Sequence, residues 1–278
     1  MKTTKRSPLL LPALAFLCIG LQTSRAEILQ NGNLETFVSG QPSSWDYLYT
    51  GGGDGMATKT NGSSPFTNIY PAGTSSLLLA DGPAYNSGPG ISQSFSSVSG
   101  TVNLSFDFKL SAMAGDPWLI LPTSTHGLTS HFLTNIRVGG SDGTFSIGNA
   151  GSMTNISPLS AGTWYQVSTT LDLANSKYSG SITTYGGSST MWTNFNLRSD
   201  VHDLTSITIE DAVFAAATNG AITVDNFSLS ASNASVVAVP ETSTWVMGFL
   251  ALGAVTFLIR RKSKGNHRTV GLEIAALR

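Results

Sequence analysis

Apolar and polar residues alternate along much of the middle of the chain. In residues 101–110 every second side chain is apolar, namely Val102, Leu104, Phe106, Phe108 and Leu110. Residues 164–172 alternate in the same way, with Tyr165, Val167 and Leu171 in the apolar phase. A period of two residues predicts β-strands that bury one face and expose the other to water. We therefore expect both segments to be strands of an antiparallel sheet.

Weaker forms of this pattern predict further strands. They cover residues 76–80, 91–95, 132–138, 144–147, 178–185, 204–209 and 222–230. In the last segment the apolar phase changes between Val224 and Phe227, which predicts a β-bulge near Asp225-Asn226. Clusters of Gly, Asn, Asp and Ser, as at 141–143 and 186–188, are typical of turns between strands. The pattern predicts an all-β fold, a single β-sandwich over residues 27–235.

Charge is scarce in this chain and unevenly distributed. Charged residues make up 11% of the 278 residues, whereas hydrophobic residues make up 41%, which is enough for a core. Residues 27–239 contain five basic and 14 acidic residues, while both ends of the chain are basic. Nucleic-acid binding needs a surface rich in Lys and Arg, so we expect no nucleic-acid partner.

The first 26 residues have the three parts of a secretory signal peptide. Basic residues among the first six positions precede an uncharged stretch, residues 7–24. Ser24-Arg25-Ala26 then places small residues where cleavage before Glu27 requires them. The alternative is an uncleaved signal anchor. Cys18 is the only cysteine and lies within the apolar stretch, so we expect a mature chain without disulfides.

A second apolar stretch lies near the C-terminus. Residues 242–259 are uncharged and would span about 27 Å as an α-helix, close to the thickness of a bilayer core. Arg260, Arg261 and Lys262 follow at once, and such a cluster stops transfer and stays in the cytoplasm. We therefore expect a transmembrane helix and a membrane partner. The alternative is a buried helix of the core.

Residues 236–264 combine three features in a fixed order: Val239-Pro240-Glu241, the apolar segment and the basic cluster. Together they resemble a bacterial PEP-CTERM sorting signal. The resemblance implies recognition by an exosortase-type membrane enzyme and passage from the inner membrane to the cell surface or extracellular matrix. This chain departs from the family's Pro-Glu-Pro motif because Thr242 replaces the second proline. It also continues through residues 265–278, an expected cytoplasmic tail.

Short motifs at the ends of the middle domain add to the strand pattern. The opening segment 28–35 and the closing segment 222–229 are similar to those of jelly-roll carbohydrate-binding modules of the galactose-binding type. Residues 162–167 resemble a strand of laminin-G or concanavalin-type sandwiches. Both families are lectin-like. The resemblance implies a jelly-roll-type β-sandwich, galactose-binding or concanavalin-like, and leaves extracellular polysaccharide as a candidate partner.

Aromatic residues flanked by turn-forming residues are candidates for stacking on a sugar ring. The candidates are Tyr47, Tyr49, Tyr70, Tyr85, Trp118 and Trp192. We expect Trp45 and Trp164 to pack in the core instead.

Glu35 and Asp225 are the candidate metal ligands. In the jelly-roll family that the motifs resemble, the opening and closing segments lie together and can hold a structural calcium ion. Calcium binds oxygen ligands, which carboxylates and backbone carbonyls supply. The alternative is that Glu35 is exposed and Asp225 stabilises the bulge. We expect no other cofactor.

The sequence contains no recognisable catalytic set. It has no Gly-x-Ser-x-Gly motif, and His126 and His131 lack the spacing of a zinc-binding helix and are expected in a surface loop. The 14 acidic residues leave a polysaccharide-acting hydrolase open, since such an enzyme needs only two opposed carboxylates. We expect an exported, membrane-anchored surface protein with a non-catalytic structural or adhesive role. A carbohydrate-binding module and a hydrolase are the alternatives.

Overall fold

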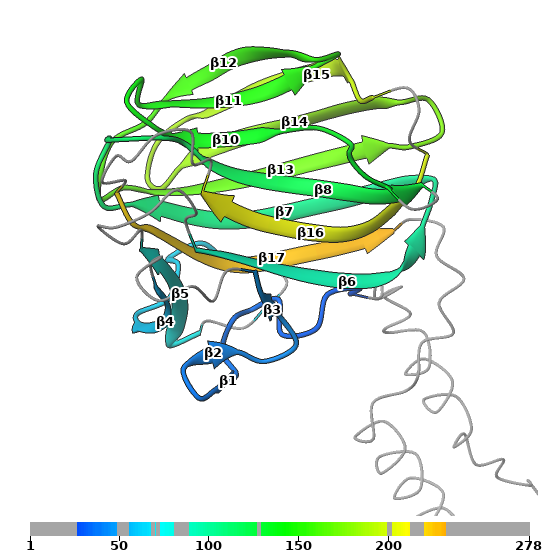
Figure 1. Ribbon diagram of the computed structural model, residues 1–278. Helices are drawn as coiled ribbons and strands as arrows, with labels where there is room; N and C mark the ends of the chain where they lie inside the picture. Colours follow the sequence, from blue (N-terminus) through cyan, green and yellow to red (C-terminus); the bar gives the residue numbers. More distant parts are fainter. Residues whose placement is uncertain are drawn as a thin grey trace, which may run out of the picture. The chain divides into compact units, whose positions relative to one another are not determined.

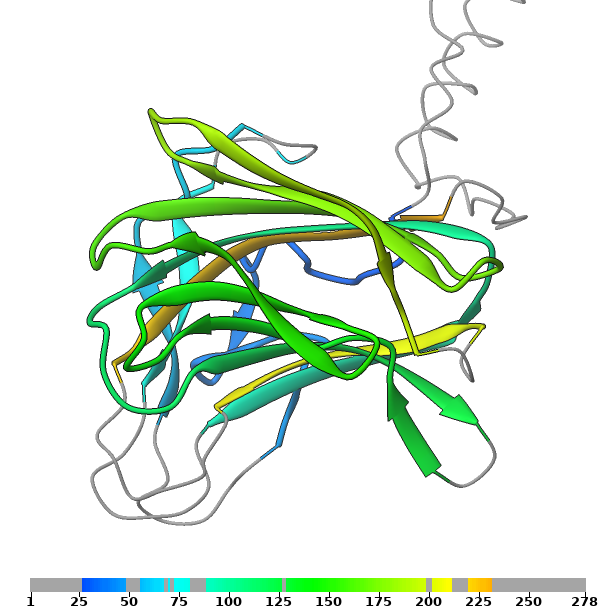
Figure 2. The ribbon, with the colours of Figure 1, turned by 90° about the horizontal axis from the view of Figure 1, so that it is seen from above.

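Two antiparallel β-sheets packed face to face make up the domain (Figure 1, Figure 2). The computed structural model describes residues 27–48, 56–67, 70, 73–80, 89–126, 129–198, 202–211 and 220–231. These ranges contain strands and turns and no helix. The all-β fold and the sandwich that the alternation predicts are therefore confirmed.

One sheet has seven strands, all paired antiparallel. Their spatial order is β15 (Ser189–Asn196), β14 (Lys177–Thr184), β13 (Trp164–Asp172), β7 (Thr101–Leu110), β17 (Ile222–Ala231), β5 (Ser75–Ala80) and β4 (Met56–Asn61). The bounds of β7 and β13 are those that the alternation predicts. The last strand of the domain, β17, lies in the interior of the sheet between β7 and β5.

The other sheet has eight strands. Its order is β12 (Ser152–Pro158), β11 (Thr144–Asn149), β10 (Ile136–Gly139), β8 (Trp118–His126), β16 (Leu204–Asp211), β6 (Gly90–Val98) and β3 (Asp46–Tyr47), and β9 (Thr129–Phe132) also pairs with β8. A separate two-stranded ribbon consists of β1 (Phe37–Val38) and β2 (Gln41–Pro42).

The predicted strand at 132–138 is divided in the structure. β9 ends at Phe132 and β10 begins at Ile136, although both strands pair with β8. Three residues lie between Phe132 and Ile136 but only two between their partners Thr123 and Ile120, so the ladder is interrupted by one extra residue. The expectation of a histidine-bearing loop is also wrong. His126 closes β8 and His131 lies in β9, where the two strands pair as a hairpin.

The core between the sheets is rich in aromatic side chains. The rings of Phe106 and Phe227 stack with their centroids 5.2 Å apart, and Phe108 stacks on Tyr165 at 5.3 Å. Trp45 meets the edge of Phe227 at 5.7 Å. Phe145 of β11, in the eight-stranded sheet, stacks on Phe108 at 6.4 Å and meets Trp192 of β15 at 5.8 Å, so ring contacts also join the two sheets across the core.

A β-bulge interrupts β17 at the predicted place. The register with β7 shifts between Asp225 and Ser228, and Asn226 has a φ of 55°, in the left-handed region. The extra residue changes the phase of alternation. As a result Val224 before the bulge and Phe227 after it are both fully buried in the core.

The expected signal peptide (1–26), sorting segment (236–264) and tail (265–278) lie outside the described residues. Within the part of the chain that the structure describes, no helix is long and apolar enough to cross a bilayer.

Gly180 of β14 is a position where the core leaves no room for a side chain. A Cβ atom there would lie 2.4 Å from Cζ2 of Trp192 and 2.5 Å from the carbonyl oxygen of Ser168. We expect Gly180→Ala to lower the free energy of unfolding by about 1–3 kcal/mol, as overpacked cores do. Urea unfolding measures the change. The neighbouring Ser181→Ala is the control, and equal stability of Gly180→Ala and wild type would contradict this account of the packing.

Candidate functional site

The predicted sugar-stacking residues do not gather on one surface. Trp118 and Trp192 are 1% and 3% exposed, so the prediction that they face a ligand is wrong. Their strands turn both indoles into the core, where Trp118 donates from Nε1 to the carbonyl of Gly220 at 3.0 Å. Tyr49 and Tyr85 lie outside the described residues.

Tyr47 and Tyr70 are half-buried and have structural contacts. Tyr47, in the edge strand β3, packs against the core. The hydroxyl of Tyr70 donates to the carbonyl of Phe227 at 2.8 Å. Each ring is therefore held against the domain, and the two belong to different parts of the fold.

Trp164 lies on the outer face of the seven-stranded sheet and is half-buried, contrary to the expectation that it packs in the core. The ammonium of Lys109, its register partner on β7, lies 5.0 Å from the centre of the indole. Tyr185, whose N–H donates to the carbonyl of Trp164 at 3.0 Å, is 55% exposed and meets the ring of Phe66 edge-on at 5.4 Å. The sequence contained the signal for Trp164, since position 164 is in phase with the polar residues Gln166 and Ser168 of β13.

Glu35 and Asp225, the predicted calcium ligands, both hold the segment between β4 and β5. Glu35 Oε1 accepts from the backbone N–H groups of Thr74 and Ser75, at 2.8 and 2.9 Å. Asp225 Oδ2 accepts from the N–H of Ser64 at 2.7 Å, and its Oδ1 from the N–H of Asn226. Each carboxylate thus anchors backbone of the segment or of the bulge.

This arrangement does not fit a calcium site. A calcium ion needs about six to eight oxygen ligands, and here N–H groups point at the carboxylate oxygens that would have to bind it. Among the residues that the structure describes, no three His, Cys, Asp or Glu side chains are grouped to hold a metal. We therefore assign Glu35 and Asp225 to anchoring the chain.

Asp107 and Asp225 form a buried carboxyl pair as register partners on β7 and β17, each 1% exposed. Asp107 accepts from Nδ2 of Asn226 at 2.9 Å and from Nε2 of Gln166 at 3.1 Å. Burial raises the pKa of both carboxyl groups, that of Asp225 to about 7, and their mutual repulsion adds to the shift in the pKa of Asp225. Glycoside hydrolysis requires carboxylates that face the substrate across a cleft, whereas this pair is covered and bonded to the protein.

A pocket of about 740 Å³ lies where edge strands of both sheets meet. We call it the end pocket. Four segments line it, residues 132–135, 148–153, 175–177 and 196–198. They are the β9–β10 connection, the β11–β12 turn, the β13–β14 turn and the end of β15.

Backbone hydrogen bonds tie these four segments together. The N–H of Ala150 donates to the carbonyl of Asn196 at 3.2 Å and joins the β11–β12 turn to β15. The N–H of Arg198 donates to the carbonyl of Leu133 at 3.1 Å, which joins β15 to the β9–β10 connection. Since the links run between the two sheets, the pocket is formed by the fold itself, as small-molecule sites usually are.

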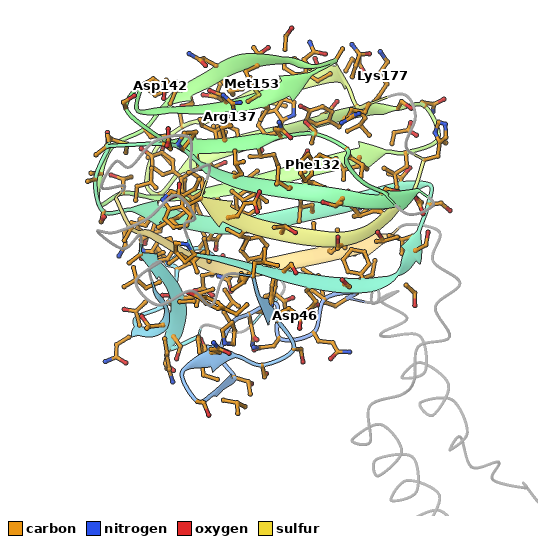
Figure 3. All side chains as sticks on the ribbon, in the orientation of Figure 1. Asp46, Phe132, Arg137, Asp142, Met153 and Lys177 are labelled. Atoms are coloured by element: carbon orange, nitrogen blue, oxygen red, sulfur yellow. The ribbon has the colours of Figure 1, made fainter. Side chains whose placement is uncertain are left out.

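The chemistry of the end pocket is that of a hydrogen-bond donor site with one apolar wall. Its polar lining includes two basic residues and three amides, namely Lys177, Arg198, Asn135, Asn175 and Asn196, and it includes no carboxylate. Phe132 is 39% exposed at the pocket (Figure 3). The ammonium of Lys177 donates to Oδ1 of Asn196, so the two side chains are oriented together.

No pattern in the sequence indicates this site. Its residues come from four turns and strand ends that are up to 66 positions apart, from Phe132 to Arg198. The single available signal was the group of turn-forming residues at 174–176, which predicts a tight hairpin but no ligand.

No protein-family model matches the chain, and no curated protein matches it. Among solved structures it is similar to a sialidase, with 12% identity and a TM-score of 0.46, over 68% of this chain and 17% of the sialidase. A cellulose-induced protein, Cip1, gives 12% identity and a TM-score of 0.45, over 68% of this chain and 91% of Cip1. A seed lectin isoform of Lotus tetragonolobus has 11% identity and a TM-score of 0.45, over 68% of this chain and 93% of the lectin. At these TM-scores the similarities assign neither ligand nor activity, and the architecture rests on the strand pairing above.

Asp225 links the stability of the fold to pH. Its pKa is about 7 in the folded protein, mainly because of burial, whereas an aspartate in an unfolded chain has a pKa of about 4. A carboxyl group with a raised folded-state pKa stabilises the fold while it is protonated. Its contribution is therefore complete below about pH 4 and is lost as the pH rises through about 7.

We expect the free energy of unfolding to fall between about pH 4 and pH 8, and to fall less in Asp225→Asn, which has no charge to gain. Urea unfolding at a series of pH values measures both slopes. Asp46→Asn, at an exposed position of β3, is the control and should keep the wild-type slope. Identical slopes for wild type and Asp225→Asn would rule out the linkage.

Proposed function

We propose that the domain is a carbohydrate-binding module-type surface lectin whose sugar site is the end pocket. The observation that carries the proposal is the combination of an exposed aromatic ring, Phe132, with amide and cationic donors in one preformed pocket. A sugar ring has apolar C–H faces and a rim of hydroxyl groups. Its recognition therefore needs one apolar surface and several hydrogen-bonding groups around it.

Binding without turnover is the proposed role of this pocket. Its lining contains no Asp or Glu, so the pair of carboxylates on which glycoside hydrolysis usually depends does not face the bound sugar. The buried pair Asp107 and Asp225 is engaged in holding the chain. The hydrolase alternative therefore has less support than the lectin.

We also propose that the sandwich is of the jelly-roll type, concanavalin-like rather than galactose-binding. Support comes from its two large sheets and from β6, β7 and β8, which follow one another in the chain but alternate between the sheets.

The cellular location of the protein is a separate proposal, and only the sequence supports it. The apolar segments at 7–24 and 242–259 and the basic cluster after the second favour an exported chain anchored in the inner membrane. Val239-Pro240-Glu241 favours later sorting by an exosortase-type enzyme to the surface or matrix. There the domain would have an adhesive or structural role through bound polysaccharide.

Phe132→Ala tests the assignment of the end pocket. We expect wild-type protein to bind a subset of a glycan array, and the variant to bind the best of these glycans about tenfold more weakly, because a stacking ring is lost. Isothermal titration measures the affinities. Tyr185→Ala removes a more exposed ring, 55% against 39% for Phe132, from a different part of the fold and should bind like wild type. Loss of binding in Tyr185→Ala alone would move the site to the seven-stranded sheet.

Mass spectrometry of the two mature termini tests the export proposal. We expect the mature chain to begin at Glu27 and to be recovered from membranes or from the cell surface. An intact chain of 278 residues in the cytosolic fraction would contradict both the predicted signal peptide and the predicted membrane anchor.

A further inference from the structure

A second pocket, of about 330 Å³, adjoins the end pocket, and Met153 lines both. It lies over the β10–β11 turn and the segment 115–117, and Arg137 and Asn155 are among its lining residues. In Figure 3 Met153 lies between Arg137 and Lys177, one from each pocket. We call this second space the Arg137 pocket.

Arg137 is placed in this pocket by the strand register. Ile136 and Val138 on either side of it are buried in the core, so its own side chain projects from the opposite face of β10. Ser146 of β11 and Asn155 of β12 follow it in the same row of register partners. The hydroxyl of Ser146 donates to Oδ1 of Asn155 at 2.7 Å, so these two neighbours satisfy each other.

The guanidinium of Arg137 has a buried donor without an acceptor. Its Nε atom is inaccessible to solvent and has no hydrogen-bond partner among the described residues. An unsatisfied buried donor is destabilising, and the Arg137 side chain as a whole is half-buried and lines the pocket, where a ligand can reach it. The fork of N–H groups on a guanidinium matches the two oxygens of a carboxylate, which makes a carboxylate the best-fitting acceptor.

The distribution of charge supports the same ligand class. Residues 27–239 hold only five basic residues, and three of them line the two pockets: Arg137, Lys177 and Arg198. An acidic domain repels a polyanion over most of its surface, and the end pocket, with Lys177 and Arg198 and no carboxylate, is where this repulsion is reversed.

Three carboxylates lie near this patch. Asp116 and Asp142 line the Arg137 pocket together with Arg137, and Asp142 accepts from the N–H of Thr144 at 3.3 Å. Asp172 is the register partner of Lys177, and its Oδ2 accepts from Nδ2 of Asn175 at 2.7 Å. None of the three lines the end pocket.

We propose that the end pocket and the Arg137 pocket are neighbouring subsites for one acidic polysaccharide. A sugar carboxylate binds the guanidinium of Arg137, and the next sugar along the chain lies in the end pocket against Phe132. This inference rests on the proposed lectin function and adds to it the ligand class, a polymer that contains uronic acid.

The experiment compares acidic oligosaccharides with neutral counterparts of the same length. The probes are oligogalacturonate, oligoglucuronate and oligomannuronate, each also in carboxyl-reduced form, titrated into the full chain in detergent. We expect at least one acidic oligomer to bind about tenfold more tightly than its reduced form. Its affinity should fall as salt is raised from about 0.05 to 0.5 M, because salt screens the charges.

Charge-removing variants locate the contact. Arg137→Gln should weaken binding of the acidic oligomer about tenfold and leave the reduced oligomer unaffected. Lys177→Gln should weaken binding of the acidic oligomer about threefold, because an ion pair with an exposed ammonium group contributes less binding energy. Lys59→Gln is the matched control, since it removes the same charge from an exposed position on β4, at the opposite edge of the seven-stranded sheet from β15.

Each alternative outcome overturns a defined part of the proposal. Equal affinity for acidic and reduced oligomers, with both weakened by Phe132→Ala, would refute the acidic ligand and leave the lectin standing. Weaker binding in Lys177→Gln but not in Arg137→Gln would refute the second subsite. An equal effect of Lys59→Gln would show non-specific attraction. Binding to no glycan, acidic or neutral, would refute the lectin itself.

Discussion

The packing of aromatic rings between the two sheets is the interaction on which the rest of the structure depends. Phe106 of β7 stacks on Phe227 of β17, so two neighbouring central strands also share ring contacts within the core. That contact exists because a bulge at Asp225-Asn226 brings Phe227 into the inward phase. The same bulge presents Asp225 to the N–H of Ser64. One irregular residue therefore couples the core to the covering segment between β4 and β5.

The functional surface lies where this regular packing ends. In the middle of each sheet, side chains on the inner face are buried in the core. At the edge strands β12 and β15 and their neighbours β11 and β14, the turns form the walls of a pocket, and backbone links such as that from Ala150 to Asn196 fix their positions. The polar side chains of the turns then face a space that the scaffold keeps open. Binding chemistry on turns held by a rigid sandwich is a common arrangement.

The sequence predicted those elements whose two faces differ in polarity. β7 and β13 alternate strictly because each lies in the interior of its sheet with one face in the core, and the phase change in β17 located the bulge. β8 was missed because its first half, Trp118 to Leu121, is apolar at every position and shows no period. β15 was missed for the opposite reason, since only Trp192 of this edge strand is buried. The pockets could not be predicted, because they depend on which turns of the two sheets come together.

The position of β17 has a consequence for how the domain is made. During synthesis from the N-terminus, residues 222–231 are the last of the described strands to emerge, yet they fill the gap between β7 and β5. Until they arrive, the first-made hairpin of β4 and β5 has no neighbour in the sheet. Closure therefore waits for pairings between distant parts of the chain, a topology that folds slowly. The seven-stranded sheet therefore cannot be completed before the chain has been made as far as residue 231.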